Sequence, residues 1–133
     1  MLSPKRFAPV LLGLVLGGCA GRMAEDGVDR VPAGKSTMLQ QTYMTMDERC
    51  RPISRPTGRL AQAPRHGSVR MLQRRASAVY GPGPHRHCDG KVGPALAFEY
   101  TPDPGYRGPD AFTVRVRYND GEIRHGRFGV EVY

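Results

Sequence analysis

His85, His87 and Cys88 lie within four consecutive residues and form the group best suited to chemistry in this chain. On an extended chain, His85 and His87 point to one side and Cys88 to the other. Two imidazoles placed in this way can hold Cu²⁺ or Zn²⁺, which predicts a weak metal site. A structural zinc site needs four ligands and would also require Cys50 or His66. The same pattern fits a solvated loop with two incidental histidines, so both interpretations stay open.

Met44 and Met46 are a second candidate group, because they lie on one side of an expected strand. Thioethers are soft ligands that suit Cu⁺. Methionines at alternate positions are also typical of core packing, where they fill irregular gaps. We favour the core for this pair.

Motifs of common enzymes are missing from the sequence. There is no G-x-S-x-G or H-E-x-x-H motif, no phosphate-binding loop and no evident pair of catalytic carboxylates. We therefore expect a protein without catalytic activity and without a cofactor.

The N-terminal residues have the pattern of a secretion signal. Lys5 and Arg6 precede the apolar run 7–16, and small residues follow it. The run is shorter than the roughly 20 residues that a membrane-spanning helix needs. We therefore expect export rather than a permanent membrane helix.

The end of this signal, Leu-Gly-Gly-Cys, resembles the lipobox of bacterial lipoproteins. The resemblance implies that residues 1–18 are removed and that Cys19 carries the lipid anchor. Ala20, rather than an aspartate, follows the cysteine, which in Gram-negative lipoproteins usually accompanies sorting to the outer membrane. An ordinary signal cut after Ala20, which would release a soluble protein, is the alternative.

The chain has three cysteines, an odd number for a protein entering an oxidising compartment. If Cys19 carries lipid, Cys50 and Cys88 remain as one disulfide pair. In the chain-entropy model, such a crosslink stabilises the fold by roughly 4 kcal/mol. We expect this disulfide crosslink to supply a large share of the stability of a small domain.

The formal net charge is +8, and it becomes +6 when Lys5 and Arg6 leave with the signal peptide. An excess of this size favours contact with anionic surfaces. Export disfavours nucleic acid as the partner. The remaining candidates are anionic cell-wall polymer, lipopolysaccharide or another envelope protein.

Residues 19–36 contain few apolar side chains and are expected to form a flexible, lipid-anchored tether. Residues 37–133 match the length of one immunoglobulin-like sandwich. Frequent Gly and Pro separate short β-rich runs, which is typical of all-β domains. We therefore predict an all-β sandwich of about seven short strands, over residues 38–46, 59–63, 67–72, 76–80, 96–101, 111–118 and 124–132.

The last two strands can be assigned a register. Apolar residues alternate along both, and placing Phe112 opposite Phe128 directs both apolar faces inward around the turn 119–121. One outward face then carries a basic row, for which we predict anion binding. Its members are Arg115, Arg117, His125 and Arg127. Arg65, Arg70, Arg74 and Arg75 would extend it if the sheets bring them close. Solvated charges that protect an edge are the alternative.

Residues 100–132 resemble the closing half of bacterial cadherin-like and immunoglobulin-like repeats. The pattern Y-x-P-x-x-G-Y-x-G-x-D-x-F-x-V-x-V is filled by Tyr100, Pro102, Gly105, Tyr106, Gly108, Asp110, Phe112, Val114 and Val116. The resemblance implies an extracellular spacer, adhesion or binding module. This chain differs by its single copy, its Cys50 and Cys88 pair and the insert 81–94. Its acidic residues are too dispersed to predict the calcium site of some relatives.

Two residues of this pattern are expected to have structural roles. Tyr106 can bury its ring and bond a loop, like the tyrosine corner of sandwiches. Asp110 can accept hydrogen bonds from nearby backbone N–H groups.

Together these features predict a non-enzymatic envelope lipoprotein, held by an N-terminal lipid and facing the periplasm or the cell surface. We expect it to be a structural or binding module of adhesion type, with a basic sheet face that contacts an anionic partner. The alternative function is that of a periplasmic Cu- or Zn-binding protein that uses His85 and His87.

Overall fold

A computed structural model describes residues 27–80 and 82–133. The predicted signal peptide 1–18 and lipidation site Cys19 lie outside these residues. In the described part of the chain, no helix is long and apolar enough to cross a membrane.

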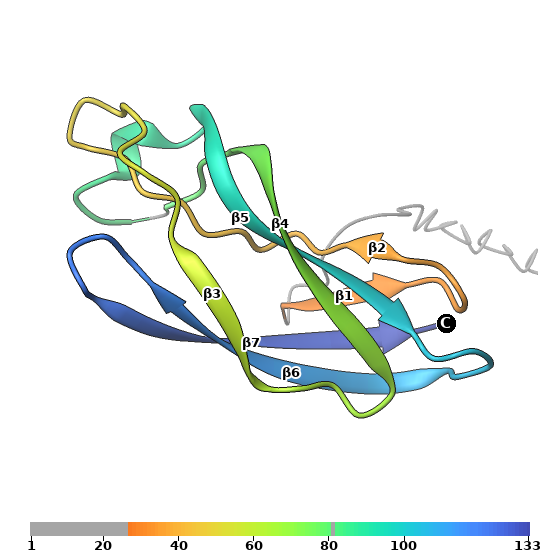
Figure 1. Ribbon diagram of the computed structural model, residues 1–133. Coiled ribbons are helices and arrows are strands. Elements are labelled where there is room, and N and C mark those ends of the chain that lie inside the picture. The colour runs from red at the N-terminus through yellow and green to blue at the C-terminus, as the bar shows by residue number, and fades with distance from the viewer. Residues whose placement is uncertain (1–26, 81) are drawn as a thin grey trace, which may run out of the picture.

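Seven strands form two sheets that pack face to face, which confirms the predicted all-β sandwich (Figure 1). The first sheet has the order β1-β7-β6-β3 and the second has the order β2-β5-β4. The orders β3-β6-β7 and β2-β5-β4 match the CFG and BED strands of an immunoglobulin-like sandwich, and β1 joins the CFG side. The strands are β1 (Val28–Val31), β2 (Thr37–Met38), β3 (Thr57–Gln62), β4 (Gly67–Ser77), β5 (Val92–Pro102), β6 (Gly108–Arg117) and β7 (Ile123–Val132), and a 3₁₀ turn, η1, covers Arg86–Cys88.

The core lies between the two sheets and is built by the alternation of apolar residues along β5, β6 and β7. Three phenylalanines meet at its centre. The rings of Phe112 and Phe128 stack with centroids 4.7 Å apart. Phe98, from the other sheet, lies 4.8 Å from Phe128, so it joins the two layers.

The predicted hairpin register is confirmed. Phe112 pairs with Phe128, and the pairing continues without a slip from Gly108 opposite Val132 to the turn. Gly121 has a φ of 86°, which is the left-handed conformation that favours glycine. Turn chemistry and the buried apolar face therefore select the same pairing.

Three strand predictions need correction. Residues 28–36 were expected in the tether, but β1 pairs in parallel with β7, and Val31 is completely buried beside Val132. The strand expected over 38–46 is interrupted, since the Gln40 N–H bonds the buried Asp29 carboxylate rather than β5. The strands expected over 67–72 and 76–80 are largely one strand, β4, which pairs continuously with β5 up to Ser77.

A buried carboxylate closes the corner between β3 and β4. Asp110 Oδ1 accepts the backbone N–H groups of Arg65 and Ala111, at 3.1 and 2.9 Å. Its Oδ2 accepts the His66 N–H at 3.0 Å and the Tyr100 hydroxyl at 2.7 Å. This confirms the role predicted for Asp110.

Tyr106 occupies the same corner. Its hydroxyl donates to the carbonyl of Pro109, and its ring stacks on His66 with centroids 4.1 Å apart. The prediction made for Tyr106 is met in part, since its acceptor lies at the start of β6 rather than in a loop and its ring is half-buried.

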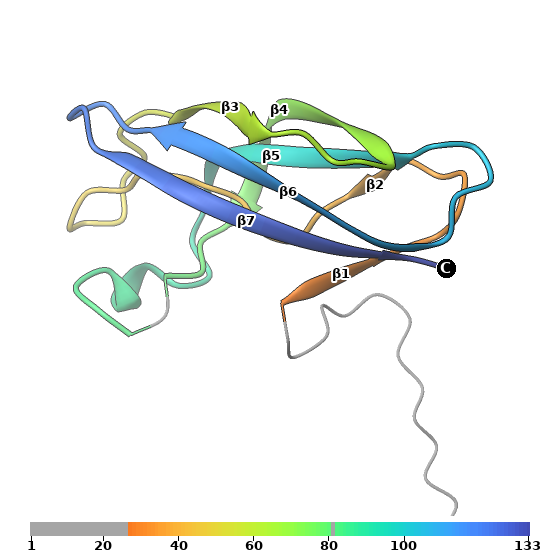
Figure 2. The ribbon, with the colours of Figure 1, turned by 90° about the horizontal axis from the view of Figure 1, so that it is seen from below.

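Three loops gather at the end of the sandwich opposite the C-terminus (Figures 1 and 2). They are the segment after β2, the insert that contains η1, and the β6–β7 turn. Figure 2 shows β6 and β7 running side by side toward this end. This loop-lined end and the outer face of the first sheet are the two candidate functional sites.

Candidate functional site

The basic face is the outer surface of β3, β6 and β7, and we define it by Arg59, Arg115, Arg117, His125 and Arg127. Arg59 lies directly opposite Arg115, and Arg115 lies directly opposite His125. Three basic residues therefore stand side by side across three strands. Neighbouring strands lie about 4.8 Å apart, so the bases of these side chains are closely spaced.

The charges of the basic face are not neutralised within the described chain. None of its four arginines has an ion pair there, whereas Arg51, Arg70 and Arg124 each pair with a carboxylate. Like charges directly opposite on a sheet are destabilising. The arrangement therefore costs stability and leaves the guanidinium groups available to an outside anion.

The part of the basic face over β3 and β6 is hollowed. A depression of about 280 Å³ is lined by Thr57, Gly58, Arg59, Arg115, Arg117 and Ile123. Guanidinium groups at its rim can bind phosphate or carboxylate through two parallel hydrogen bonds. The face is thus suited to anions.

Sequence reasoning placed Arg115, Arg117, His125 and Arg127 on one outward face, and the structure brings them together. It missed Arg59. Alternation indicated a strand there, but only the tertiary pairing of β3 with β6 shows which neighbour Arg59 faces.

The suggested extension of this face is wrong for Arg70, Arg74 and Arg75. Arg70, Arg74 and Arg75 lie on β4, in the other sheet, and Arg70 is paired with Glu99 at 3.1 Å. Arg65 lies in the β3–β4 connection, where its backbone is held by Asp110. Arg70, Arg74 and Arg75 are therefore separate from the basic face, whereas Arg65 lines a depression together with Arg127.

The insert forms a second candidate site. The predicted Cys50–Cys88 disulfide is present, with Cα atoms 5.2 Å apart. Cys88 is completely buried, and it packs with Met44, Met46, Ala78 and Ala95 in a small second core. The methionine pair is therefore core, as favoured from the sequence.

His85 and His87 do not converge as an extended chain would place them. Residues 86–88 form η1, and the two imidazoles are nearly parallel with centroids 6.5 Å apart. Two imidazoles on one tetrahedral zinc ion would have centroids about 5 Å apart with both rings directed at the metal. His85 instead lies near Tyr80, and His87 Nε2 lies 2.6 Å from the Glu48 carbonyl oxygen.

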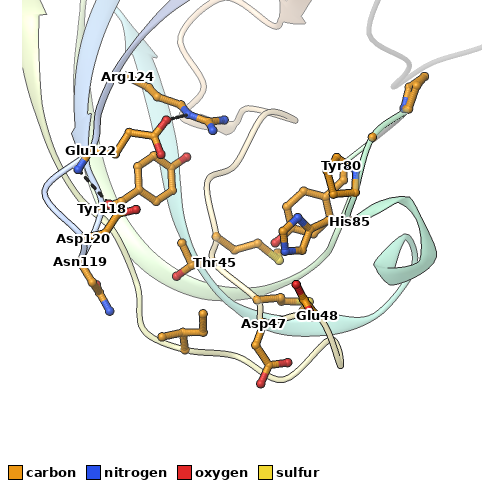
Figure 3. Close-up of a pocket in the computed structure, with 16 residues that line it drawn as sticks. Thr45, Asp47, Glu48, Tyr80, His85, Tyr118, Asn119, Asp120, Glu122 and Arg124 are labelled. Carbon is orange, nitrogen blue, oxygen red and sulfur yellow. Dashed lines mark hydrogen bonds and ion pairs between the residues drawn. The ribbon is translucent and has the colours of Figure 1, made fainter.

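A cleft of about 630 Å³ opens between the three loops at the end of the sandwich (Figure 3). Tyr118 lies on one side, and Tyr80 and His85 lie on the other. Four of the ten acidic residues in the described chain line this cleft, namely Asp47, Glu48, Asp120 and Glu122. Aromatic rings and carboxylates together suit an organic cation.

Most of these carboxylates are engaged within the protein. Asp47 accepts the Arg51 backbone N–H and guanidinium, and these bonds, the backbone one above all, lower the pKa of Asp47. Asp120 accepts the Glu122 N–H, and Glu122 pairs with Arg124 at 2.9 Å. The acidic residues therefore mainly hold the loops in place, and the basic face is the stronger binding candidate.

No family model, curated protein or solved structure matches this chain.

Proposed function

We propose that this protein is a non-enzymatic, lipid-anchored envelope module that contacts an anionic partner through its basic face. The observation that carries the proposal is the row of Arg59, Arg115 and His125 across three strands, with no ion pair to its arginines in the described residues. Repulsion within the row opposes folding. A bound anion would offset this repulsion, so anion binding explains why the row is present.

The geometry favours a partner with repeated anionic groups. Basic side chains follow one another at about 4.8 Å across the strands and at roughly 7 Å along them, where alternate residues share a face. Phosphates or carboxylates repeated along a polymer can engage several such positions together. Anionic cell-wall polymer and lipopolysaccharide have this property, and an acidic envelope protein is the remaining candidate.

The N-terminal signal places the module in the envelope in this proposal, with Cys19 as its anchor in the outer membrane. Because β1 begins at Val28, the chain from Cys19 to the folded domain can span at most roughly 30 Å. This distance is shorter than a tether reaching to residue 36 would allow. The partner is therefore expected close to the membrane surface.

Two matched variants of the mature protein test the proposal. One changes the four arginines of the basic face to glutamine. The other changes Arg74, Arg75, Arg86 and Arg107, which are exposed and lack an ion pair in the described structure. Both lose the same net charge, so long-range attraction falls equally in the two proteins.

Retention on lipopolysaccharide and on purified anionic cell-wall polymer is measured against salt concentration. We expect the basic-face variant to bind at least about tenfold more weakly than wild type, which corresponds to the loss of roughly 1.4 kcal/mol. The comparison variant should stay close to wild type and keep its steep salt dependence. Equal losses in the two variants would show that net charge, not this face, governs binding.

A further inference from the structure

We propose that reduction of the Cys50–Cys88 disulfide exposes a three-ligand metal site, formed by both thiolates and His87, that takes a thiophilic cation such as Zn²⁺. The ligand atoms of these three residues all lie within 4.8 Å of one another. Imidazole nitrogen and cysteine sulfur are the ligands that zinc prefers. The proposal is independent of the basic face, which lies on a different part of the sandwich.

The distances require only small movements. Zn–S bonds are about 2.3 Å and Zn–N bonds about 2.0–2.1 Å, so ligand atoms around a tetrahedral ion lie roughly 3.3–3.8 Å apart. The sulfurs must separate once their bond is broken, and the imidazole must approach them slightly. Both changes are within the reach of side-chain rotation.

The segments that carry these ligands lie outside the sheets. Cys50 lies in a short turn, where its N–H bonds the Asp47 carbonyl, and it has a positive φ of 59°, which is uncommon outside glycine. Cys88 ends η1, and His87 is exposed on it. None of the three residues lies in a strand, so the sheets need not move.

His87 is a better ligand than His85 for a structural reason. His87 lies against the disulfide and is oriented by the Glu48 carbonyl, 2.6 Å from its Nε2. His85 packs beside Tyr80, with ring centroids 5.2 Å apart, at the edge of the cleft. His87 is therefore the proposed ligand, and His85 is the matched control.

A dithiol reductant transfers two electrons and two protons to the disulfide, which gives two thiols and an oxidised dithiol. Zn²⁺ then displaces two protons from these thiols and binds the imidazole, with a fourth position left for water. The metal closes the same loop as the disulfide, so it can replace the covalent staple.

The test uses the mature protein, reduced under anaerobic conditions and titrated with Zn²⁺ against a competing chromophoric chelator. We expect one ion per chain for the reduced protein and an affinity at least about 100-fold higher than for the oxidised protein. His87→Ala should weaken binding by at least about tenfold, whereas His85→Ala should stay within about twofold of wild type. A reduced protein without saturable binding, or equal effects of the two substitutions, would overturn the proposal.

Co²⁺ provides a second readout, which reports directly on the atoms that bind the metal. Tetrahedral thiolate coordination gives intense visible bands and sulfur-to-metal charge-transfer bands, and His87→Ala should change both. Metal binding should also restore hydrogen-exchange protection around Cys88, because the loop is closed again. Co²⁺ spectra that are the same in wild type and in His87→Ala would refute the assignment of the third ligand.

Discussion

The buried pair Tyr100–Asp110 should be a major source of stability, and its contribution should depend on pH. Tyr100 is completely buried and donates its hydroxyl to Asp110 Oδ2 at 2.7 Å. A hydrogen bond to a charged group contributes roughly 1.5–3 kcal/mol, so Tyr100→Phe should cost about 2 kcal/mol. For a domain of this size, that lowers the melting temperature by roughly 10 °C.

Asp110→Ala should cost more, about 4 kcal/mol, because it removes the acceptor of several hydrogen bonds and leaves the buried Tyr100 hydroxyl with only the His66 carbonyl, at 3.4 Å. The freed backbone N–H groups of Arg65 and His66 belong to exposed residues, so water can replace part of their bonds. The double variant should cost less than the two single changes combined. The difference, the coupling free energy, should be about 1.5–2 kcal/mol at neutral pH.

Acid should weaken this coupling, because protonation removes the charge that strengthens the hydrogen bond. Burial alone would raise the pKa of Asp110, but the hydrogen bonds from Tyr100 and the backbone lower it below its usual value. A group with a lowered pKa in the folded state stabilises the protein above its unfolded pKa of about 3.9. That stability is lost as the pH falls through the folded pKa.

Urea unfolding with the disulfide intact, followed by far-ultraviolet circular dichroism at pH 7 and at about pH 2, measures the free energy of unfolding of each protein. The proteins compared are the wild type, the two single variants and the double variant. Tyr106→Phe is the matched control, since it removes a more exposed hydroxyl in the same corner. We expect this control to cost less than about 1 kcal/mol, independent of pH. A coupling below about 0.5 kcal/mol at pH 7, or an equal coupling at pH 2, would refute the reasoning.

Two further changes test packing and crosslinking. Gly126→Ala would drive a methyl group into the hydroxyl of Tyr43, and it should cost about 1–3 kcal/mol in urea unfolding. Gly129→Ala meets only the edge of a valine side chain and should cost clearly less; equal costs would contradict the assigned packing. Replacing both Cys50 and Cys88 by alanine should lower the free energy of unfolding by about 4 kcal/mol, and a loss below about 1 kcal/mol would show that the crosslink does not constrain the unfolded chain as expected.

Local patterns were sufficient for the closing hairpin and for the disulfide. Apolar alternation in β6 and β7 leaves one register that buries both apolar faces, and Gly121 supplies the turn conformation that this register needs. These features depend on residues close in sequence, or on the few ways of pairing cysteines.

Contacts between distant segments were decided by the tertiary structure. Val28–Val31 is short and has one charged residue at each of its two central positions, so only its parallel pairing with β7 shows that it is part of the sheet. Arg59 became part of the basic face because β3 lies beside β6 rather than beside β4. His87 lies near the disulfide because η1 turns the chain, whereas an extended chain would direct Cys88 away from both histidines.

The sequence by itself therefore determined the fold class, the strand faces and the hairpin register, because these follow from side-chain period and turn chemistry. Only the tertiary structure decided which basic residues share a surface and which histidine meets the cysteines. Those relations depend on the order of strands in each sheet and on the path of a loop. Both are set by the packing free energy of the whole domain, which no short stretch of sequence contains.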